Sequence, residues 1–295
     1  MQSSGIQRAQ VGDLEIAYET FGDAGDPPIL LVMGLATQMI GWPDEFCAGL
    51  ADRGYFVVRF DNRDIGLSTH LDSAGAPDIL TVLGGDASSV PYGLADLADD
   101  TVGLLDALGL DSVHLIGASM GGMIAQLVAL RHPARVRSLT SIMSTTGDPS
   151  VGGPSEAALA LLVAPAARDR DAAVQRVIDT YRVVGSPGFE FDESALRERA
   201  GLSFDRAYDP AGVARQLAAV LTTPDRTRAL KGISVPTLVI HGSDDALVNV
   251  SGGRATAAAV PDAELLVVDG MGHDLPRAMW PEITDRITAL IERAG

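Results

Sequence analysis

The stretch from Val113 to Gly121, with the sequence VHLIGASMG, decides the fold class. Its first four residues are mostly apolar and predict a buried strand, and a helix is expected over residues 120–131. Between them, Gly117-Ala118-Ser119-Met120-Gly121 matches the pattern Gly-X-Ser-X-Gly, which is typical of a strained turn that presents a nucleophilic serine. The two glycines lack the Cβ atoms that would collide in such a turn. We therefore predict that Ser119 begins a helix, with its hydroxyl above a sheet.

Strands and helices alternate on both sides of this stretch. Strands are expected over residues 13–21, 28–33, 55–60, 112–116, 136–143, 235–241 and 265–268. Helices are expected over residues 42–52, 94–108, 120–131, 255–259 and 279–293. This alternation predicts a mainly parallel, doubly wound α/β sheet. Residues 69–91 show no clear periodicity and are expected to form a long loop.

A helical insert interrupts the alternation. Residues 147–154 are rich in turn-forming residues, and between 155 and 230 only helices are expected, with apolar stripes at helical spacing. The chain therefore divides into an α/β core of residues 1–147 and 231–295 and a helical domain of residues 148–230. This insert holds ten arginines and twelve acidic residues, which predict solvated helix faces rather than an anion site.

Charge and cysteine content exclude several classes of protein. The 295 residues include 39 acidic and 22 basic side chains, for a formal charge of −17, so nucleic acid and anionic membrane surfaces are not expected as partners. The single cysteine, Cys47, excludes an intramolecular disulfide, and the scattered histidines offer no metal-ligand spacing. Residues 1–12 lack the apolar core of a secretory signal. We therefore expect a soluble, cytoplasmic protein that needs no metal or other cofactor.

A serine hydroxyl is a weak nucleophile and requires a neighbouring base. Of the five histidines, only His273 follows the final predicted strand, where open α/β sheets collect their functional residues. His114 and His241 lie in apolar strands and are expected to pack there, and His132 is expected to close a helix. His70, in the long loop, is the alternative base.

The remaining parts of such a site are an acid and an oxyanion hole. The acid is expected after the strand over residues 235–241, where the residues alone leave Asp244 and Asp245 as alternatives. An oxyanion hole requires two N–H donors. We assign them to Met120, the residue after the serine, and to Leu35, in the loop that follows the strand over residues 28–33.

These motifs together resemble those of the α/β-hydrolase fold superfamily, over nearly the whole chain. The stretches that carry the resemblance are residues 31–34, 61–68, 117–121, 236–245 and 271–273. The resemblance implies an eight-stranded sheet flanked by helices, with residues 148–230 as a helical cap over the active site, called the cap segment below. In the family the acid stands three residues after the glycine that ends its strand, which selects Asp245. The resemblance thus implies a catalytic triad of Ser119, His273 and Asp245.

Two departures from the common family pattern narrow the resemblance. Met33-Gly34 stands where many members have His-Gly, and Asp64 replaces the first glycine of the pattern Asp-X-Arg-Gly-X-Gly-X-Ser. With the nearby stretch over residues 41–46, these features are similar to the group containing aclacinomycin methylesterase, which cleaves a carbomethoxy ester.

The function that this resemblance implies is hydrolysis of a carboxylic ester of a small molecule, such as a methyl ester of a bulky apolar compound. The same triad also supports lactone hydrolysis, C–C bond hydrolysis and cofactor-free haloperoxidase or perhydrolase chemistry, and the fold serves in non-catalytic ligand-binding proteins. Trp42, Tyr181 and Phe204 are candidate substrate-binding residues, with packing in the interior as the alternative for each. The sequence indicates neither the substrate nor the oligomeric state.

Overall fold

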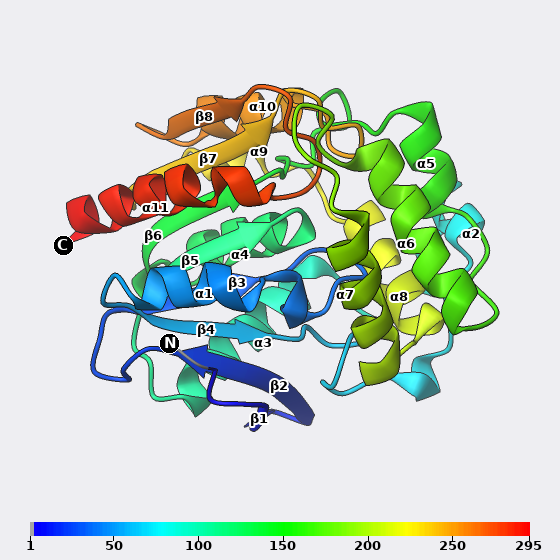
Figure 1. The fold of residues 1–295 in the computed structure, drawn as a ribbon, viewed down its shortest axis with the longest axis horizontal. Coiled ribbons are helices and arrows are strands. Elements are labelled where there is room, and N and C mark those ends of the chain that lie inside the picture. Colours follow the sequence, from blue (N-terminus) through cyan, green and yellow to red (C-terminus); the bar gives the residue numbers. More distant parts are fainter. Residues whose placement is uncertain (1–2) are drawn as a thin grey trace.

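Eight strands form one sheet in the computed structural model, which describes residues 3–295 (Figure 1). Their order across the sheet is β1-β2-β4-β3-β5-β6-β7-β8. Strand β2 pairs antiparallel with β1 and with β4, and all other neighbours are parallel. The mainly parallel, eight-stranded α/β sheet is therefore confirmed. The strands are β1 (Gln7–Val11), β2 (Leu14–Phe21), β3 (Pro28–Val32), β4 (Phe56–Phe60), β5 (Val113–Ala118), β6 (Val136–Ile142), β7 (Thr237–Gly242) and β8 (Glu264–Val268).

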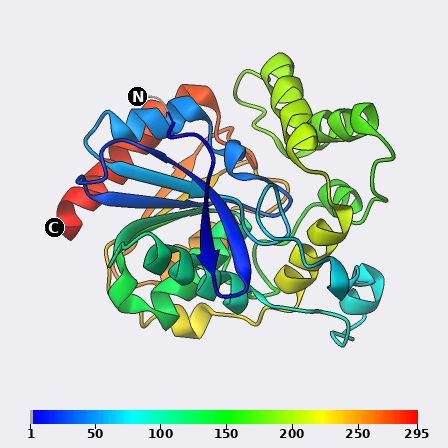
Figure 2. The same ribbon diagram turned by 90° about the horizontal axis from the view of Figure 1, so that it is seen from below.

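Helices cover both faces of the sheet, as Figure 2 shows. Helices α3 (Leu94–Ala107), α4 (Met120–Arg131) and α10 (Ser251–Ala259) pack on one face, where they share a hydrophobic cluster with the strands. Helices α1 (Asp44–Ala51) and α11 (Trp280–Ala294) pack on the other. All six residues of β5 and all six of β7 are buried, because central parallel strands are covered on both sides.

Five helices occupy the chain between β6 and β7, and four of them gather at one end of the sheet (Figure 1). They are α5 (Glu156–Leu162), α6 (Arg170–Val184), α7 (Glu193–Arg206), α8 (Pro210–Leu221) and the short α9 (Thr227–Leu230). Each of the first four begins at a serine or aspartate whose side chain accepts a backbone N–H of the first turn: Ser155, Asp169, Asp192 and Asp209. These hydrogen bonds at the N-termini explain where the four helices start.

Two elements differ from the sequence expectations. Strand β1 was not expected, because only Ala9 and Val11 of this edge strand are buried and the apolar alternation is too short to detect. Residues 69–91 are not wholly a loop, since they contain a 3-10 turn over Asp72–Ala74 and helix α2 (Ile79–Leu83). Helix α2 is capped by Asp78 and packs beside α8 of the cap segment. A helix of five residues is too short to carry a periodic pattern.

The expectation that the cap arginines lie on solvated faces is wrong for three of them. Arg215 has no exposed side-chain surface, and its Nη2 lies 2.7 Å from Asp64 Oδ1. Arg206 is 9% exposed and pairs with Asp61 at 2.7 Å, while Arg226 is buried and donates to Thr145 O at 2.9 Å. These guanidinium groups connect the cap segment to the core, and burial of each is compensated by hydrogen bonds.

No helix among residues 3–295 has both the length and the apolar character needed to cross a bilayer.

Candidate active site

Ser119 lies in a strained turn between β5 and α4. Its φ of 56° and ψ of −121° fall outside the regions that non-glycine residues ordinarily adopt, a conformation that persists only where its surroundings impose it. A Cβ atom at Gly117 would lie 2.1 Å from Gly121 O, and one at Gly121 would lie 2.1 Å from Val32 O. Both positions of the predicted motif therefore require glycine.

The structure brings Ser119, His273 and Asp245 together from the ends of three strands. His273 Nε2 lies 2.9 Å from Ser119 Oγ, and His273 Nδ1 lies 2.7 Å from Asp245 Oδ2. The carboxylate requires a proton on Nδ1, which leaves Nε2 free to accept the serine proton. An arrangement of this kind can activate the Ser119 hydroxyl for attack on an electrophilic carbon.

The Asp245 carboxylate is buried and surrounded by donors. Its Oδ1 accepts the N–H groups of Leu247 and Val248 at 2.9 and 2.8 Å. Burial alone would raise the pKa of Asp245, but the hydrogen bonds from His241 and His273 and from Val248 lower it to about 2. This carboxylate is therefore ionised at neutral pH. Asp244 is exposed and accepts a hydrogen bond from Ser243 Oγ, so its side chain points to the turn and not to His273.

His241 is nearer to this site than the sequence suggested. It is buried at the end of β7, as expected, but its Nε2 donates to Val248 O at 2.7 Å and lies 3.4 Å from Asp245 Oδ2. The four-residue spacing between His241 and Asp245, across the turn that ends β7, was the available signal. His70, the alternative base, is bound instead to Asp209 at 2.7 Å and to Gly66 O at 3.0 Å.

The loop after β3 passes directly against Ser119. A Cβ atom at Gly34 would lie 3.0 Å from Ser119 Cβ and 3.5 Å from its Oγ. Thr37 N donates to Gly34 O at 3.3 Å, and Ala36 has a φ of 59°, which together are typical of a type II turn. Leu35 is the second residue of this turn. Met120, the other expected donor, is the first residue of α4, where backbone N–H groups lack partners within the helix.

Gln216 of α8 ties this turn to the cap segment. Its Oε1 accepts the Ala36 N–H at 3.2 Å, and its Nε2 donates to Arg63 O at 2.8 Å. The side chain has no exposed surface. Only an amide offers an acceptor and a donor at these two points, so Gln216 fits this position where glutamate would not.

Asp64 explains one departure from the common family pattern. It adopts a φ of 66°, the left-handed region that glycine enters without cost, at the position where many members have glycine. Hydrogen bonds to its carboxylate compensate for the cost of this backbone conformation. The carboxylate accepts two from Arg215, at 2.8 and 2.7 Å, and one each from Tyr92 Oη and Leu71 N at 2.7 Å.

Asp64 also belongs to a cluster of three potential metal ligands. Ligand atoms of Asp64, His70 and Asp209 lie within 4.8 Å of one another. Arg215 bonds to both carboxylates, and each ring nitrogen of His70 faces an oxygen acceptor. The atoms that a cation would need are thus already engaged in hydrogen bonds and ion pairs within the protein.

The three predicted substrate-binding side chains have different surroundings. Trp42 has no exposed surface and stacks on Phe46 with ring centroids 5.6 Å apart, which corresponds to the packing alternative. Burial raises the pKa of Tyr181, as does the charge of Asp274, the residue after His273, while Arg199 lowers it. Phe204 of α7 is half-buried, and its ring centroid lies 4.8 Å from that of Tyr208.

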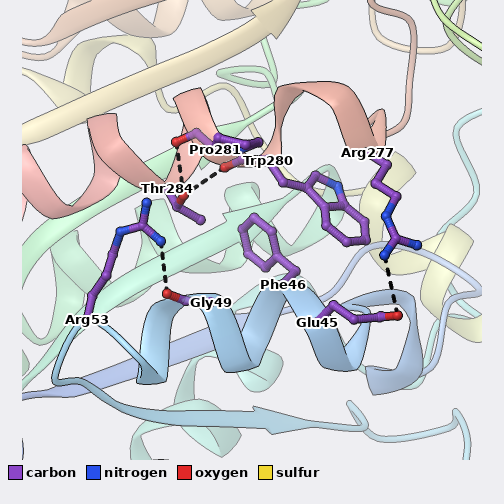
Figure 3. Close-up of a pocket in the computed structure, with 8 residues that line it drawn as sticks. All are labelled: Glu45, Phe46, Gly49, Arg53, Arg277, Trp280, Pro281 and Thr284. Carbon is purple, nitrogen blue, oxygen red and sulfur yellow. Dashed lines mark hydrogen bonds and ion pairs between the residues drawn. The ribbon is translucent and has the colours of Figure 1, made fainter. Parts of the chain in front are cut away.

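A groove of about 310 Å³ lies elsewhere, between α1 and α11 (Figure 3). Phe46 and Trp280 face each other in it, with Arg53 and Arg277 toward its two ends. Arg277 lies 3.7 Å from Glu45 and 5.3 Å from the centre of the Trp280 ring. Neither Ser119, His273 nor Asp245 lines this groove.

The chain belongs to the α/β hydrolase fold family, whose model matches residues 27–276, and it is an esterase-type enzyme of this fold. It is 31% identical to rhodomycin D methylesterase DauP of Streptomyces sp. (strain C5), over 92% of this chain and 93% of that protein. It is 28% identical to 3-oxoadipate enol-lactonase 2 of Acinetobacter baylyi, over 88% of this chain and 90% of the relative. Among solved structures, a hydrolase from Pseudomonas aeruginosa PA01 superposes with a TM-score of 0.75 at 25% identity, with 98% of each chain covered.

Proposed function

We propose that this protein is a serine hydrolase that cleaves a carboxylic ester through an acyl-enzyme. Ser119 is the nucleophile, His273 the general base and Asp245 the acid that orients the imidazole. The observation that carries the proposal is the continuous hydrogen-bonded chain from Ser119 Oγ through both nitrogens of His273 to Asp245.

The reaction follows from the position of the imidazole. As Ser119 Oγ attacks the ester carbonyl carbon, Nε2 of His273 takes its proton and Asp245 stabilises the imidazolium. The tetrahedral intermediate collapses, and the imidazolium returns the proton to the departing alcohol. His273 then deprotonates a water molecule that attacks the acyl-enzyme, which releases the carboxylic acid and restores the Ser119 hydroxyl.

The N–H groups of Leu35 and Met120 are proposed to bind the oxyanion. The contact between Gly34 and Ser119 supports this role, because it brings the turn that contains Leu35 against the nucleophile. The N-terminus of α4 adds the positive end of a helix dipole to the same region. One oxyanion donor is worth roughly a hundredfold to a thousandfold in kcat.

The substrate is proposed to be a small ester, such as a methyl ester, of a bulky apolar compound. The rhodomycin D methylesterase relative supports a methyl ester, and its match extends over nearly all of both chains. The cap segment, residues 148–230, would roof the site, with Tyr181 and Phe204 as candidate wall residues. Hydrolysis of an enol-lactone is the second candidate, because an enol-lactonase is also among the relatives and a lactone is a cyclic ester.

Hydrolysis of p-nitrophenyl acetate, butyrate and octanoate by the wild type and by Ser119→Ala tests this function. We expect turnover by the wild type and a loss of several orders of magnitude in kcat in the variant. The preferred chain length would then indicate the size of the acyl pocket. Equal rates in the two proteins, or a wild type inert toward these esters and toward a panel of aromatic methyl esters and enol-lactones, would contradict the proposal.

A further inference from the structure

The loop that carries His273 is bound to the cap segment by backbone hydrogen bonds. His273 N donates to Val184 O at 2.6 Å, and Gly188 N donates to Gly270 O at 2.9 Å. Val184 is the last residue of α6, and Gly188 lies in the connection between α6 and α7. The cap segment therefore supports the backbone of His273 directly.

Ser186 lies at the centre of this contact. Its Oγ accepts the Gly272 N–H at 2.9 Å and donates to the Asp274 carboxylate. One hydroxyl therefore bonds to the residue before His273 and to the residue after it. With the bond from His273 itself to Val184, three successive residues of the histidine loop bond to the same short stretch of the cap segment.

The packing between these two segments leaves no room for a side chain at Gly188 or Gly272. A Cβ atom at Gly188 would lie 2.7 Å from Gly270 Cα, and one at Gly272 would lie 2.2 Å from Gly185 O. None of the residues Gly185, Gly188 and Gly272 has a positive φ. Close approach of the other segment, and not the backbone conformation, therefore accounts for the glycines at Gly188 and Gly272. The two segments meet as backbone against backbone.

We propose that Ser186 is a positioning residue for His273, whose hydroxyl fixes the histidine loop against the cap segment and so places the imidazole between Ser119 and Asp245. This inference rests on the proposed role of His273 as the base. An imidazole with hydrogen bonds of 2.9 and 2.7 Å on its two sides tolerates little displacement, and an error of about 1 Å costs roughly a hundredfold in rate.

Asp274 gives Ser186 an electrostatic role in addition to the geometric one. Burial raises the pKa of the Asp274 carboxyl above its usual value overall, and the Ser186 hydroxyl, His273 and Arg199 each limit this rise. The Ser186 hydrogen bond thus favours the carboxylate form of a residue that adjoins His273. An anion there stabilises the imidazolium that forms when Ser119 gives up its proton.

The test uses the rate at which a fluorophosphonate labels Ser119, measured from pH 5 to 9. This rate can be measured without knowledge of the substrate. Ser186→Ala removes both hydrogen bonds, and we expect the limiting rate to fall about tenfold. We also expect the pH midpoint of labelling to move to lower pH, because Asp274 loses the hydrogen bond that favours its carboxylate form, and with it the imidazolium loses part of its stabilisation. Ser186→Thr keeps a hydroxyl and should restore both quantities toward the wild-type values.

A second pair of variants separates the effect of the position of the His273 loop from the effect of the charge of Asp274. Gly188→Ala places a methyl group against Gly270 and should lower the labelling rate without removing any polar group. Gly153→Ala is the matched control, since Gly153 also lies in the cap segment, has no positive φ and has open space around it. This control should label at the wild-type rate.

The outcomes distinguish this inference from the proposed function. A wild type that does not react with the phosphonate would overturn the proposed function, and the inference with it. A wild type that reacts, with Ser186→Ala unchanged in both rate and pH midpoint, would overturn the inference alone. A fall in rate that Ser186→Thr does not restore would also contradict it.

Discussion

Asp64 and Arg215 are 151 residues apart in the chain and form a two-point ion pair in which neither side chain has exposed surface. Arg215 Nε and Nη2 donate to the two oxygens of Asp64 at 2.8 and 2.7 Å. The pair joins α8 of the cap segment to the loop after β4, next to the turn that Gln216 holds. The pair therefore joins the cap segment to the core close to the turn that contacts Ser119.

Removal of one partner of this pair should strongly destabilise the protein. Arg215→Met leaves the Asp64 carboxylate buried without its cation, and we expect the free energy of unfolding to fall by about 3–5 kcal/mol. Denaturant titration followed by circular dichroism measures it. Arg197→Ala, which breaks an exposed pair with Glu193, should cost less than about 1 kcal/mol.

The double variant Asp64→Gly/Arg215→Met removes both charges and places glycine at a positive φ. It should regain part of the lost stability, because no unpaired charge remains. Equal unfolding free energies for Arg215→Met and Arg197→Ala would contradict this account of the pair.

His70 should make the contact between the loop after β4 and α8 sensitive to pH. Burial lowers the pKa of His70, but hydrogen bonds to Gly66 O and Asp209, with the charges of Asp209 and Asp64, raise it above 6.5 overall. Arg215 and Tyr92 also belong to this cluster. Because the folded protein holds the proton more tightly, this stabilisation is complete below about pH 6.5 and is lost as the pH rises through the folded-state pKa.

We therefore expect the difference in unfolding free energy between the wild type and His70→Phe to shrink from pH 5.5 to pH 8.5. His132→Phe is the control, since His132, which follows α4, pairs with the exposed Asp99 of α3. A difference that grows with pH would contradict the assigned direction of the pKa shift.

Asp245→Asn should lower kcat by about ten thousandfold with little change in structure. The asparagine amide can turn an N–H toward His273 Nδ1 and favour the tautomer that cannot accept the serine proton. Asp244→Asn, one residue away and exposed, is the matched control and should retain activity. Since the pKa of Asp245 is lowered to about 2, the stability that its ionised form adds should persist from neutral pH down to about pH 4 and disappear toward pH 2.

Gln216→Glu should impair the turn that contains Leu35. The substitution keeps the size of the side chain but places a carboxylate oxygen against Arg63 O, where the Gln216 amide donates at 2.8 Å. We expect kcat for p-nitrophenyl butyrate to fall at least about tenfold, with a smaller change in KM, because the oxyanion donor acts mainly in the transition state. The exposed Gln10→Glu serves as the control, and a KM effect with unchanged kcat would argue against a role of this turn in catalysis.

The parts of the structure that depend on local patterns could be predicted from the sequence. Helix α4 spans the expected residues 120–131, and the observed turn at Ser119 requires both glycines of the predicted pattern. Asp245 was selected from two adjacent acids by its family spacing, and the structure places its side chain against His273. Strand β1 and helix α2 escaped prediction because each buries too few residues to leave a periodic signal.

The contacts between the cap segment and the core could not be predicted from a single sequence. Arg215 and Asp64, or Ser186 and Gly272, are ordinary polar residues and glycines in their local context. Their pairing depends on how α6, α7 and α8 lie over the end of the sheet, which no spacing along the chain encodes. Trp42, a candidate substrate-binding residue, packs on Phe46 in the interior, which is the alternative expected from the sequence.

The most direct test of the central claim is to find which residue a fluorophosphonate modifies, by mass spectrometry of the digested protein. The account predicts a single adduct on Ser119, absent in Ser119→Ala and formed at least about a hundredfold more slowly in His273→Ala. An adduct on another residue, no adduct in the wild type, or an unchanged rate in His273→Ala would contradict a nucleophilic Ser119 activated by His273.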